Sequence, residues 1–121
     1  MIDHVTFRVS DVEVSKKFYE TTFAPLGYKI TFGKDGVFHA FNIGDGLFEI
    51  MQSEDNKVLT KTHIALRAKD KNEVDTFYAA GLKAGGKDNG KPGPRPEYTE
   101  TYYASFILDP DGHNIEVCFD N

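Results

Sequence analysis

The chain has 121 residues, a formal net charge of -5 and a pI near 5.3, a length that corresponds to one domain. The acidic balance and the scattered lysines argue against a nucleic-acid partner, and no apolar run approaches the ~20 residues that a membrane span needs. No charged and then apolar signal segment precedes the first predicted strand, and the single Cys118 has no disulfide partner, so we expect a cytoplasmic protein.

An internal repeat organises the sequence. Residues 3–9 (DHVTFRV) recur as residues 62–68 (THIALRA), at an offset of 59 residues that also places Phe18 on Phe77 and Gly27 on Gly86. The repeat predicts two similar modules, about 1–53 and 62–121, within a single domain 1–121. Each module begins with a strand that carries one histidine.

The first module predicts one strand, one helix and three further strands. Residues 2–9 alternate between two faces, which indicates a strand. Ser10 or Asp11 then caps a helix that extends to residues 23–24 and ends before Pro25. Short strands separated by Asp-Gly turns are predicted at 27–33, 36–43 and 46–52.

The second module repeats this order after a polar link at 53–61. A strand at 62–68 precedes a helix that Asp70 caps and that ends near residue 84. Residues 87–101 contain three prolines and are expected to form a long loop that absorbs the second strand. Long loops in compact domains are often functional. Strands follow at 102–109 and 113–119. The predicted fold class is α+β, with two βαβββ modules in tandem that form a cupped mixed sheet with helices outside.

Strand phase places one histidine and one glutamate of each module on the face away from the helix. His4 precedes Thr6 and Arg8 on that face in the first module, and Glu49 lies on the corresponding face of its last strand. His63 and Glu116 occupy the equivalent positions in the second module.

Imidazole and carboxylate ligands together suit Zn, Ni, Co, Mn or Fe. Two histidines and one glutamate would leave open positions for substrate, whereas Glu49 would complete a four-ligand set. A lone strand histidine or glutamate is more often a solvated surface residue, but the paired placement favours a metal site.

Other polar residues have simpler interpretations. His39 is out of phase and is expected to be a surface or core residue without a partner, and His113 is expected to be exposed. Arg8 and Arg67 are either anion-binding residues in the cleft or ion-paired strand residues. Cys118 has no basic neighbour and is expected to be an inert, packed thiol.

The whole chain resembles the vicinal oxygen chelate superfamily. The resemblance rests on HVTFRV, FEIM, THIAL and, most specifically, DPDGHNIEV at residues 109–117. That superfamily contains glyoxalase I, fosfomycin-resistance thiol transferases, extradiol dioxygenases and metal-free bleomycin-resistance proteins. The pieces APLG and GPRP, with the tyrosines that follow, resemble a branch of short members.

The resemblance to glyoxalase I implies a metal-dependent lyase or isomerase that acts on a small α-oxo or thiol-adduct substrate through a metal-stabilised enediolate. It implies His4, Glu49, His63 and Glu116 as ligands of the divalent metal, with Glu116, or else Glu49, as the base. Substrate-binding residues are expected among two groups: Arg8, Arg67 and Arg95, and Tyr98, Tyr102 and Tyr103. Members build the site within one chain or across a dimer, and we expect a homodimer.

The resemblance also implies alternatives. A non-catalytic, bleomycin-resistance-like protein would bind a small ligand or an antibiotic in an aromatic cleft of Phe41, Phe48 and the three tyrosines. Thiol transferases and ring-cleaving dioxygenases would use three ligands, which fall on His4, His63 and Glu116.

Overall fold

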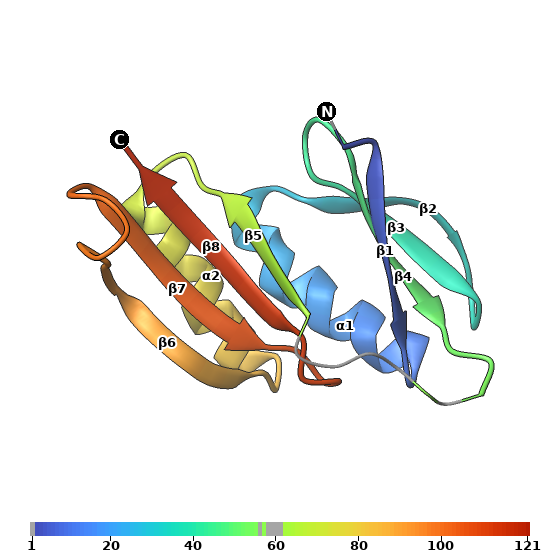
Figure 1. The fold of residues 1–121 in the computed structure, drawn as a ribbon. Coiled ribbons are helices and arrows are strands. Elements are labelled where there is room, and N and C mark those ends of the chain that lie inside the picture. Colours follow the sequence, from blue (N-terminus) through green and yellow to red (C-terminus); the bar gives the residue numbers. More distant parts are fainter. Residues whose placement is uncertain (1, 56, 58–61) are drawn as a thin grey trace.

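The computed structural model describes residues 2–55, 57 and 62–121, so the predicted link at 53–61 lies partly outside the described residues. The first half contains β1 (His4–Val9), α1 (Val12–Phe23), the short 3-10 helix η1 (Ala24–Leu26), β2 (Lys29–Lys34), β3 (Phe38–Asn42) and β4 (Leu47–Gln52). The second half contains β5 (His63–Arg67), α2 (Lys71–Lys83), β6 (Lys87–Pro94), β7 (Tyr102–Leu108) and β8 (Asn114–Asp120). The α+β class and the two tandem βαβββ modules are confirmed (Figure 1).

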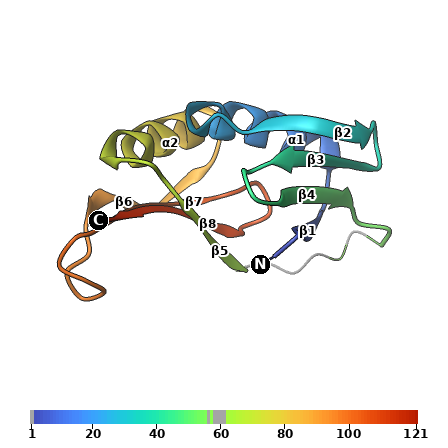
Figure 2. The same cartoon turned by 90° about the horizontal axis from the view of Figure 1, so that it is seen from above.

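The strands form one four-stranded mixed sheet in each half, in the orders β1-β4-β3-β2 and β5-β8-β7-β6. The first and last strands of each half are parallel, and the other neighbours are antiparallel. Each helix packs on the sheet of its own half, and the two helices contact each other. Figure 2 shows both helices side by side on the same side of the molecule.

An aspartate caps the N-terminus of each of the two α-helices. Asp11, the second of the two predicted caps, accepts hydrogen bonds from the backbone N–H groups of Glu13 and Val14 at 3.1 and 3.2 Å. Asp70 accepts one from the N–H of Glu73 at 2.9 Å. These carboxylates satisfy N–H groups that have no partner within the helix.

Aromatic side chains fill the core of the first half. Phe48 lies 4.9 Å from Tyr19 and 5.1 Å from Phe23 between ring centroids, and Phe41 is equally buried beside Phe23. Phe48 is therefore enclosed in the core, and Phe41 borders a pocket with Tyr28 and Ile30 rather than with Tyr98, Tyr102 or Tyr103. The predicted aromatic cleft of Phe41, Phe48 and these three tyrosines is not formed.

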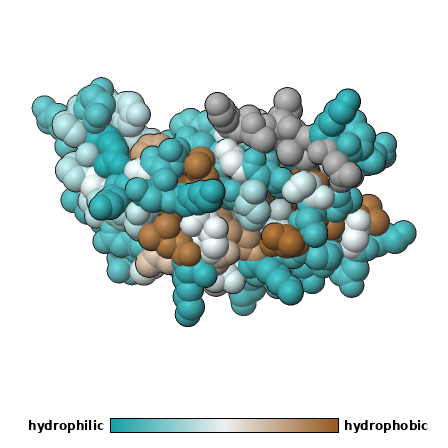
Figure 3. Space-filling model, turned by 90° about the horizontal axis from the view of Figure 1, so that it is seen from below, coloured by the Kyte–Doolittle hydropathy of each residue, from teal (hydrophilic) through white to brown (hydrophobic). Residues whose placement is uncertain are grey.

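In the described part of the chain, most large apolar side chains are buried, and those at the surface are dispersed. On the face shown in Figure 3, hydrophilic residues predominate and hydrophobic residues form small separate patches. Neither of the two helices described is long and apolar enough to cross a bilayer.

A buried carboxylate joins the two halves. Asp109, in the turn between β7 and β8, accepts a hydrogen bond from the Tyr19 hydroxyl of α1 at 2.6 Å. The same carboxylate accepts the backbone N–H groups of Asp111 and His113 at 2.9 and 2.8 Å. The His113 ring also stacks on Phe7 of β1, with centroids 4.9 Å apart. Contacts from α1 and β1 thus hold the turn that leads into β8.

Residues 87–101 are not one long loop. Lys87–Pro94 form β6, which pairs with β7 at the edge of the second sheet. Its register is irregular at Gly90, and an edge strand tolerates proline because one of its sides makes no sheet hydrogen bonds. The proline spacing therefore gave a wrong prediction, and only residues 95–101 form the loop.

Two histidines also differ from the prediction. His113 is 1% exposed rather than at the surface, because Phe7 and Thr62 cover it. His39 is buried as a core residue, but it has a partner: its Nε2 lies 3.0 Å from Glu13 Oε2.

The contact between the halves predicts a pH-dependent effect of Tyr19→Phe. Burial raises the pKa of Asp109, while hydrogen bonds from Tyr19 and backbone N–H groups partly oppose that rise. Because Asp109 binds its proton more tightly when folded, stability falls as the pH rises from the unfolded-state pKa through the folded-state pKa. Loss of the Tyr19 hydroxyl raises the folded-state pKa further, so that fall becomes larger.

We therefore expect Tyr19→Phe to lower the free energy of unfolding by about 1–3 kcal/mol at neutral pH and by less near pH 3, where the carboxyl is protonated in both states. Urea denaturation at both pH values measures this difference. Tyr28→Phe, in a half-buried tyrosine, is the matched control. An equal loss at both pH values would contradict a role for the charged Asp109.

Candidate functional site

A histidine and a glutamate are in direct contact on the open face of the second sheet. β5 and β8 are parallel and pair Ala65 with Glu116, so His63 lies two residues earlier on the same face. His63 Nε2 lies 2.8 Å from Glu116 Oε1. The side chain of His63 is 51% exposed and that of Glu116 only 4%, so the pair presents its imidazole outward.

Tyr102 holds the other oxygen of Glu116. Its hydroxyl donates to Glu116 Oε2 from the neighbouring strand β7. Burial, followed by hydrogen bonds with Cys118 and Glu116, raises the pKa of Tyr102, so the phenol stays protonated and acts as a donor. The Glu116 carboxylate is thus oriented from both sides.

Phe106 completes this group of side chains and was not predicted. It pairs with Glu116 across β7 and β8, and its ring centroid lies 6.2 Å from that of His63. The Arg95 guanidinium carbon lies 5.4 Å from the Phe106 centroid. Only the antiparallel register of β7 and β8 reveals that Phe106 shares a face with Glu116.

The loop after β6 borders the same face. Tyr98 is 60% exposed and its ring lies 5.1 Å from that of Tyr102. The hydroxyls of Thr101 and Thr99 donate to Asp120 of β8 at 2.6 and 2.8 Å, and these bonds lower the pKa of Asp120. The loop that carries Tyr98 is therefore anchored to β8.

Tyr103 lies on the other face of the sheet. Its hydroxyl donates to Asp75 of α2 at 2.7 Å, and the Lys71 ammonium lies 5.3 Å from its ring centroid. Tyr103 therefore contacts α2 rather than Glu116. Cys118 is half-buried beside Tyr102, on the site face.

The first half contains the equivalent pair in a more open form. β1 and β4 pair Thr6 with Glu49, and Thr6 Oγ1 donates to Glu49 Oε1 at 2.9 Å. His4 Nδ1 instead lies 2.7 Å from Asp3 Oδ1. Ala65 occupies the place of Thr6 in the second half and has no hydroxyl, which leaves Glu116 to His63.

Arg8 and Arg67 line separate pockets. Arg8 borders a pocket of about 280 Å³ with Phe7, and Arg67 borders one of about 570 Å³ with Tyr28. They do not meet in one cleft in the structure of a single chain.

The ligand atoms of His4, Glu49, His63 and Glu116 do not converge within residues 2–55, 57 and 62–121. In these ranges the group of His, Cys, Asp and Glu whose ligand atoms all lie within 4.8 Å is a different one, Glu13, Asp35 and His39. Each half nevertheless offers one imidazole nitrogen and one carboxylate, which is a donor set suited to a divalent first-row metal. Each half alone supplies two ligands.

Comparisons with known proteins match the whole architecture. The model of the Glyoxalase/Bleomycin resistance protein/Dioxygenase superfamily matches residues 1–117. The metallothiol transferase FosB of Shouchella clausii is 33% identical over an alignment 123 residues long, which spans 96% of this chain and 77% of that protein.

Solved structures agree. A glyoxalase/bleomycin resistance protein from Albidiferax ferrireducens has a TM-score of 0.87 and 28% identity, covering 98% of both chains. Lactoylglutathione lyase from Agrobacterium tumefaciens has a TM-score of 0.74 and 19% identity, covering 98% of this chain and 92% of that one, and shows the likeness of fold.

The open pair of the first half predicts how His4 titrates. The hydrogen bond to Asp3 and, next, the charge of Glu49 raise the pKa of His4. Carboxylates favour the imidazolium, so their removal lowers the pKa. In metal-free protein we expect Asp3→Asn to lower the His4 pKa most, Glu49→Gln to lower it less, and Glu20→Gln on α1 to leave it unchanged. NMR titration of the ring proton measures each value, and an unchanged pKa in Glu49→Gln would show that Glu49 does not act on His4.

Proposed function

Because the chain belongs to the Glyoxalase/Bleomycin resistance protein/Dioxygenase superfamily, we propose that it is a metal-dependent lyase or isomerase that acts on a small α-oxo or thiol-adduct substrate. The observation that carries this proposal is the repeated His–Glu pair, at the same place in the register of both halves. The ligands would be His4, His63 and Glu116, with Glu49 as a fourth. A divalent metal (Zn, Ni, Co, Mn or Fe) would supply Lewis acidity toward substrate oxygens.

The two glutamates have surroundings that suit different roles. Glu116 is buried and held by His63 and Tyr102, so its oxygens point in fixed directions, as a ligand requires. Glu49 is half-buried and its side chain accepts one hydrogen bond, from the exposed Thr6 hydroxyl. Glu49 can therefore rotate toward a substrate and accept a proton from carbon, so we propose Glu49 as the base, in place of Glu116, the first choice from the family resemblance.

Substrate would bind beside the second pair. Tyr98 offers exposed aromatic surface beside Tyr102, and Arg95 offers positive charge next to the buried Phe106 ring. The guanidinium of Arg95 already donates to the backbone oxygens of Gly93 and Lys91 at 2.9 and 2.8 Å, which holds it in place. A small substrate with a carboxylate or other anionic group suits this edge of the site.

A complete ligand set would require a second copy of the chain. Each half of one chain carries one histidine and one glutamate on its open face, and β1 and β5 are edge strands of their sheets. A groove of about 750 Å³ lies between these strands, and its apolar lining includes Val5, Leu47, Ile64 and Leu66. We propose a homodimer in which the first half of one protomer faces the second half of its partner.

Thiol transfer is a second candidate. It is favoured by the 33% identity to a metallothiol transferase over nearly the whole chain. In such a reaction an external thiol attacks the substrate and no carboxylate has to remove a proton from carbon. Glu49 is then not needed as a base, and His4, His63 and Glu116 would be the three ligands. Glu49→Gln therefore separates the two candidates: it abolishes lyase turnover and leaves thiol transfer.

The proposal predicts the behaviour of the metal-loaded protein. At this site we expect about one divalent metal per chain, and we expect His63→Ala and Glu116→Gln each to bind it roughly tenfold or more weakly, because each variant loses a ligand. Elemental analysis and titration with Zn, Ni, Co, Mn and Fe measure this. Glu100→Gln, in an exposed glutamate, is the control.

Turnover is then followed with methylglyoxal–thiol hemithioacetals and, separately, with fosfomycin and a thiol. Turnover of the first that disappears in Glu49→Gln supports the lyase; turnover of the second supports thiol transfer. The proposal is overturned if the metal-loaded protein turns over neither substrate and binds these compounds equally well before and after the metal is removed by chelation. That result would indicate a non-catalytic binding protein.

Shared sites predict complementation between two inactive variants. His4→Ala and His63→Ala chains each lack one ligand for every site. Mixed dimers would regain one intact site of two, so refolding an equal mixture should restore about a quarter of wild-type metal binding and turnover. Sites within one chain would give no recovery on mixing, and a monomer in sedimentation would also exclude the dimer.

A further inference from the structure

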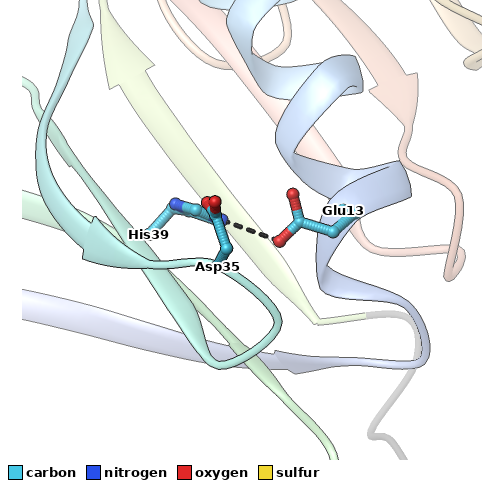
Figure 4. A group of neighbouring side chains, drawn as sticks. All are labelled: Glu13, Asp35 and His39. Carbon is cyan, nitrogen blue, oxygen red and sulfur yellow. Dashed lines mark hydrogen bonds and ion pairs between the residues drawn. The ribbon is translucent and has the colours of Figure 1, made fainter.

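Three potential metal ligands meet on the helix side of the first sheet, opposite the face of His4 and Glu49. Glu13 lies in the first turn of α1, Asp35 in the turn between β2 and β3, and His39 in β3 (Figure 4). Their ligand atoms all lie within 4.8 Å of one another. We propose that these three residues bind a divalent first-row cation such as Zn²⁺, which suits these ligands, and that the ion links α1 to the β2–β3 hairpin.

The imidazole is held in place by burial and by a glycine. His39 is 3% exposed and pairs with Ile50 on the core face of β3 and β4. A Cβ atom on Gly33 would lie 2.7 Å from His39 Nδ1, so only glycine at this position leaves room for the ring. The ring therefore directs Nε2 toward α1, where Glu13 Oε2 lies 3.0 Å away.

The turn between β2 and β3 positions both carboxylates. Gly36 has φ +76, and its N–H donates to Glu13 Oε2 at 2.8 Å. This bond holds the Glu13 side chain over the hairpin. Asp35, the residue before Gly36, is exposed, so its carboxylate can rotate toward an ion without disturbing packed side chains. Figure 4 shows Asp35 and His39 together on the hairpin, opposite Glu13 on α1.

The donor set fits a cation of this kind. One imidazole and two carboxylates suit zinc and similar borderline metals, and two carboxylates balance the charge of a divalent ion. Ligand atoms at about 2.1 Å from a tetrahedral ion are roughly 3.4 Å apart, close to the present spacing of His39 and Glu13. The ion would take the place of the proton between them, with Asp35 as third ligand and water as fourth.

Asp35 separates a metal site from a simple ion pair. His39 and Glu13 alone would form a partly buried contact that fastens the hairpin to the helix, and such a contact has no need of Asp35. A metal site needs it as the third ligand. Asp35→Asn therefore weakens metal binding while it leaves the His39–Glu13 contact intact.

The test uses His63→Ala/Glu116→Gln protein, so that the metal site of the proposed function is removed from every sample. Zn²⁺ is added in calorimetric titrations to this protein and to the same protein with Asp35→Asn. Asp45→Asn, in the exposed turn between β3 and β4, is the matched control. We expect one Zn²⁺ per chain, bound about tenfold or more weakly after Asp35→Asn and unchanged after Asp45→Asn.

Thermal unfolding provides a second readout. Zn²⁺ should raise the Tm of the double variant and of Asp45→Asn, and should raise it less in Asp35→Asn, because a ligand stabilises the state that binds it. The inference is overturned if the double variant binds no Zn²⁺, or if Asp35→Asn binds Zn²⁺ as tightly as Asp45→Asn does. Since the His63 and Glu116 side chains are replaced in every sample, neither result depends on the proposed lyase activity.

Discussion

The buried carboxylate of Asp109 is the constraint on which the relation between the two halves depends. It receives the Tyr19 hydroxyl from α1 and two backbone N–H groups from its own turn. A buried carboxylate that lost these donors would be left unsatisfied at a cost of a few kcal/mol. β8 begins at Asn114, directly after this turn, so the same contact sets the position of Glu116 relative to the first half.

Parallel pairing of the first and last strands then makes the halves equivalent. In each half the histidine lies two residues before the residue opposite the glutamate, so both side chains share the open face. The halves differ at two positions of the repeat beside these side chains, Asp3 against Thr62 and Thr6 against Ala65. Thr6 donates to Glu49 while His4 contacts Asp3, whereas Ala65 has no hydroxyl and Glu116 contacts His63. A duplicated fold can in this way provide one fixed and one movable carboxylate.

Strand phase made most of this architecture predictable, because alternation over residues 2–9 and 62–68 reports which face is buried. Contacts between distant segments carry no such local signal. His113 follows an Asp-Gly turn, which predicts exposure, yet Phe7 from the other half covers it. Lys87–Pro94 contain two prolines, and only their place at the sheet edge, known from the strand order, explains why they still form a strand. His39 has its partner Glu13 on a different element, 26 residues away.

The two faces of the first sheet therefore differ in what they need to bind a metal. On the open face, His4 and Glu49 come from neighbouring strands and provide two ligands, and the remaining ligands must come from another module. On the core face, the helix packs against the hairpin within the same half, so Glu13 and His39 meet without any assembly. The packing that forms the core thus also preorganises the second cluster, whereas the open face depends on how modules associate. Binding at the core face should respond to folding of the first half, and binding at the open face to association of the chains.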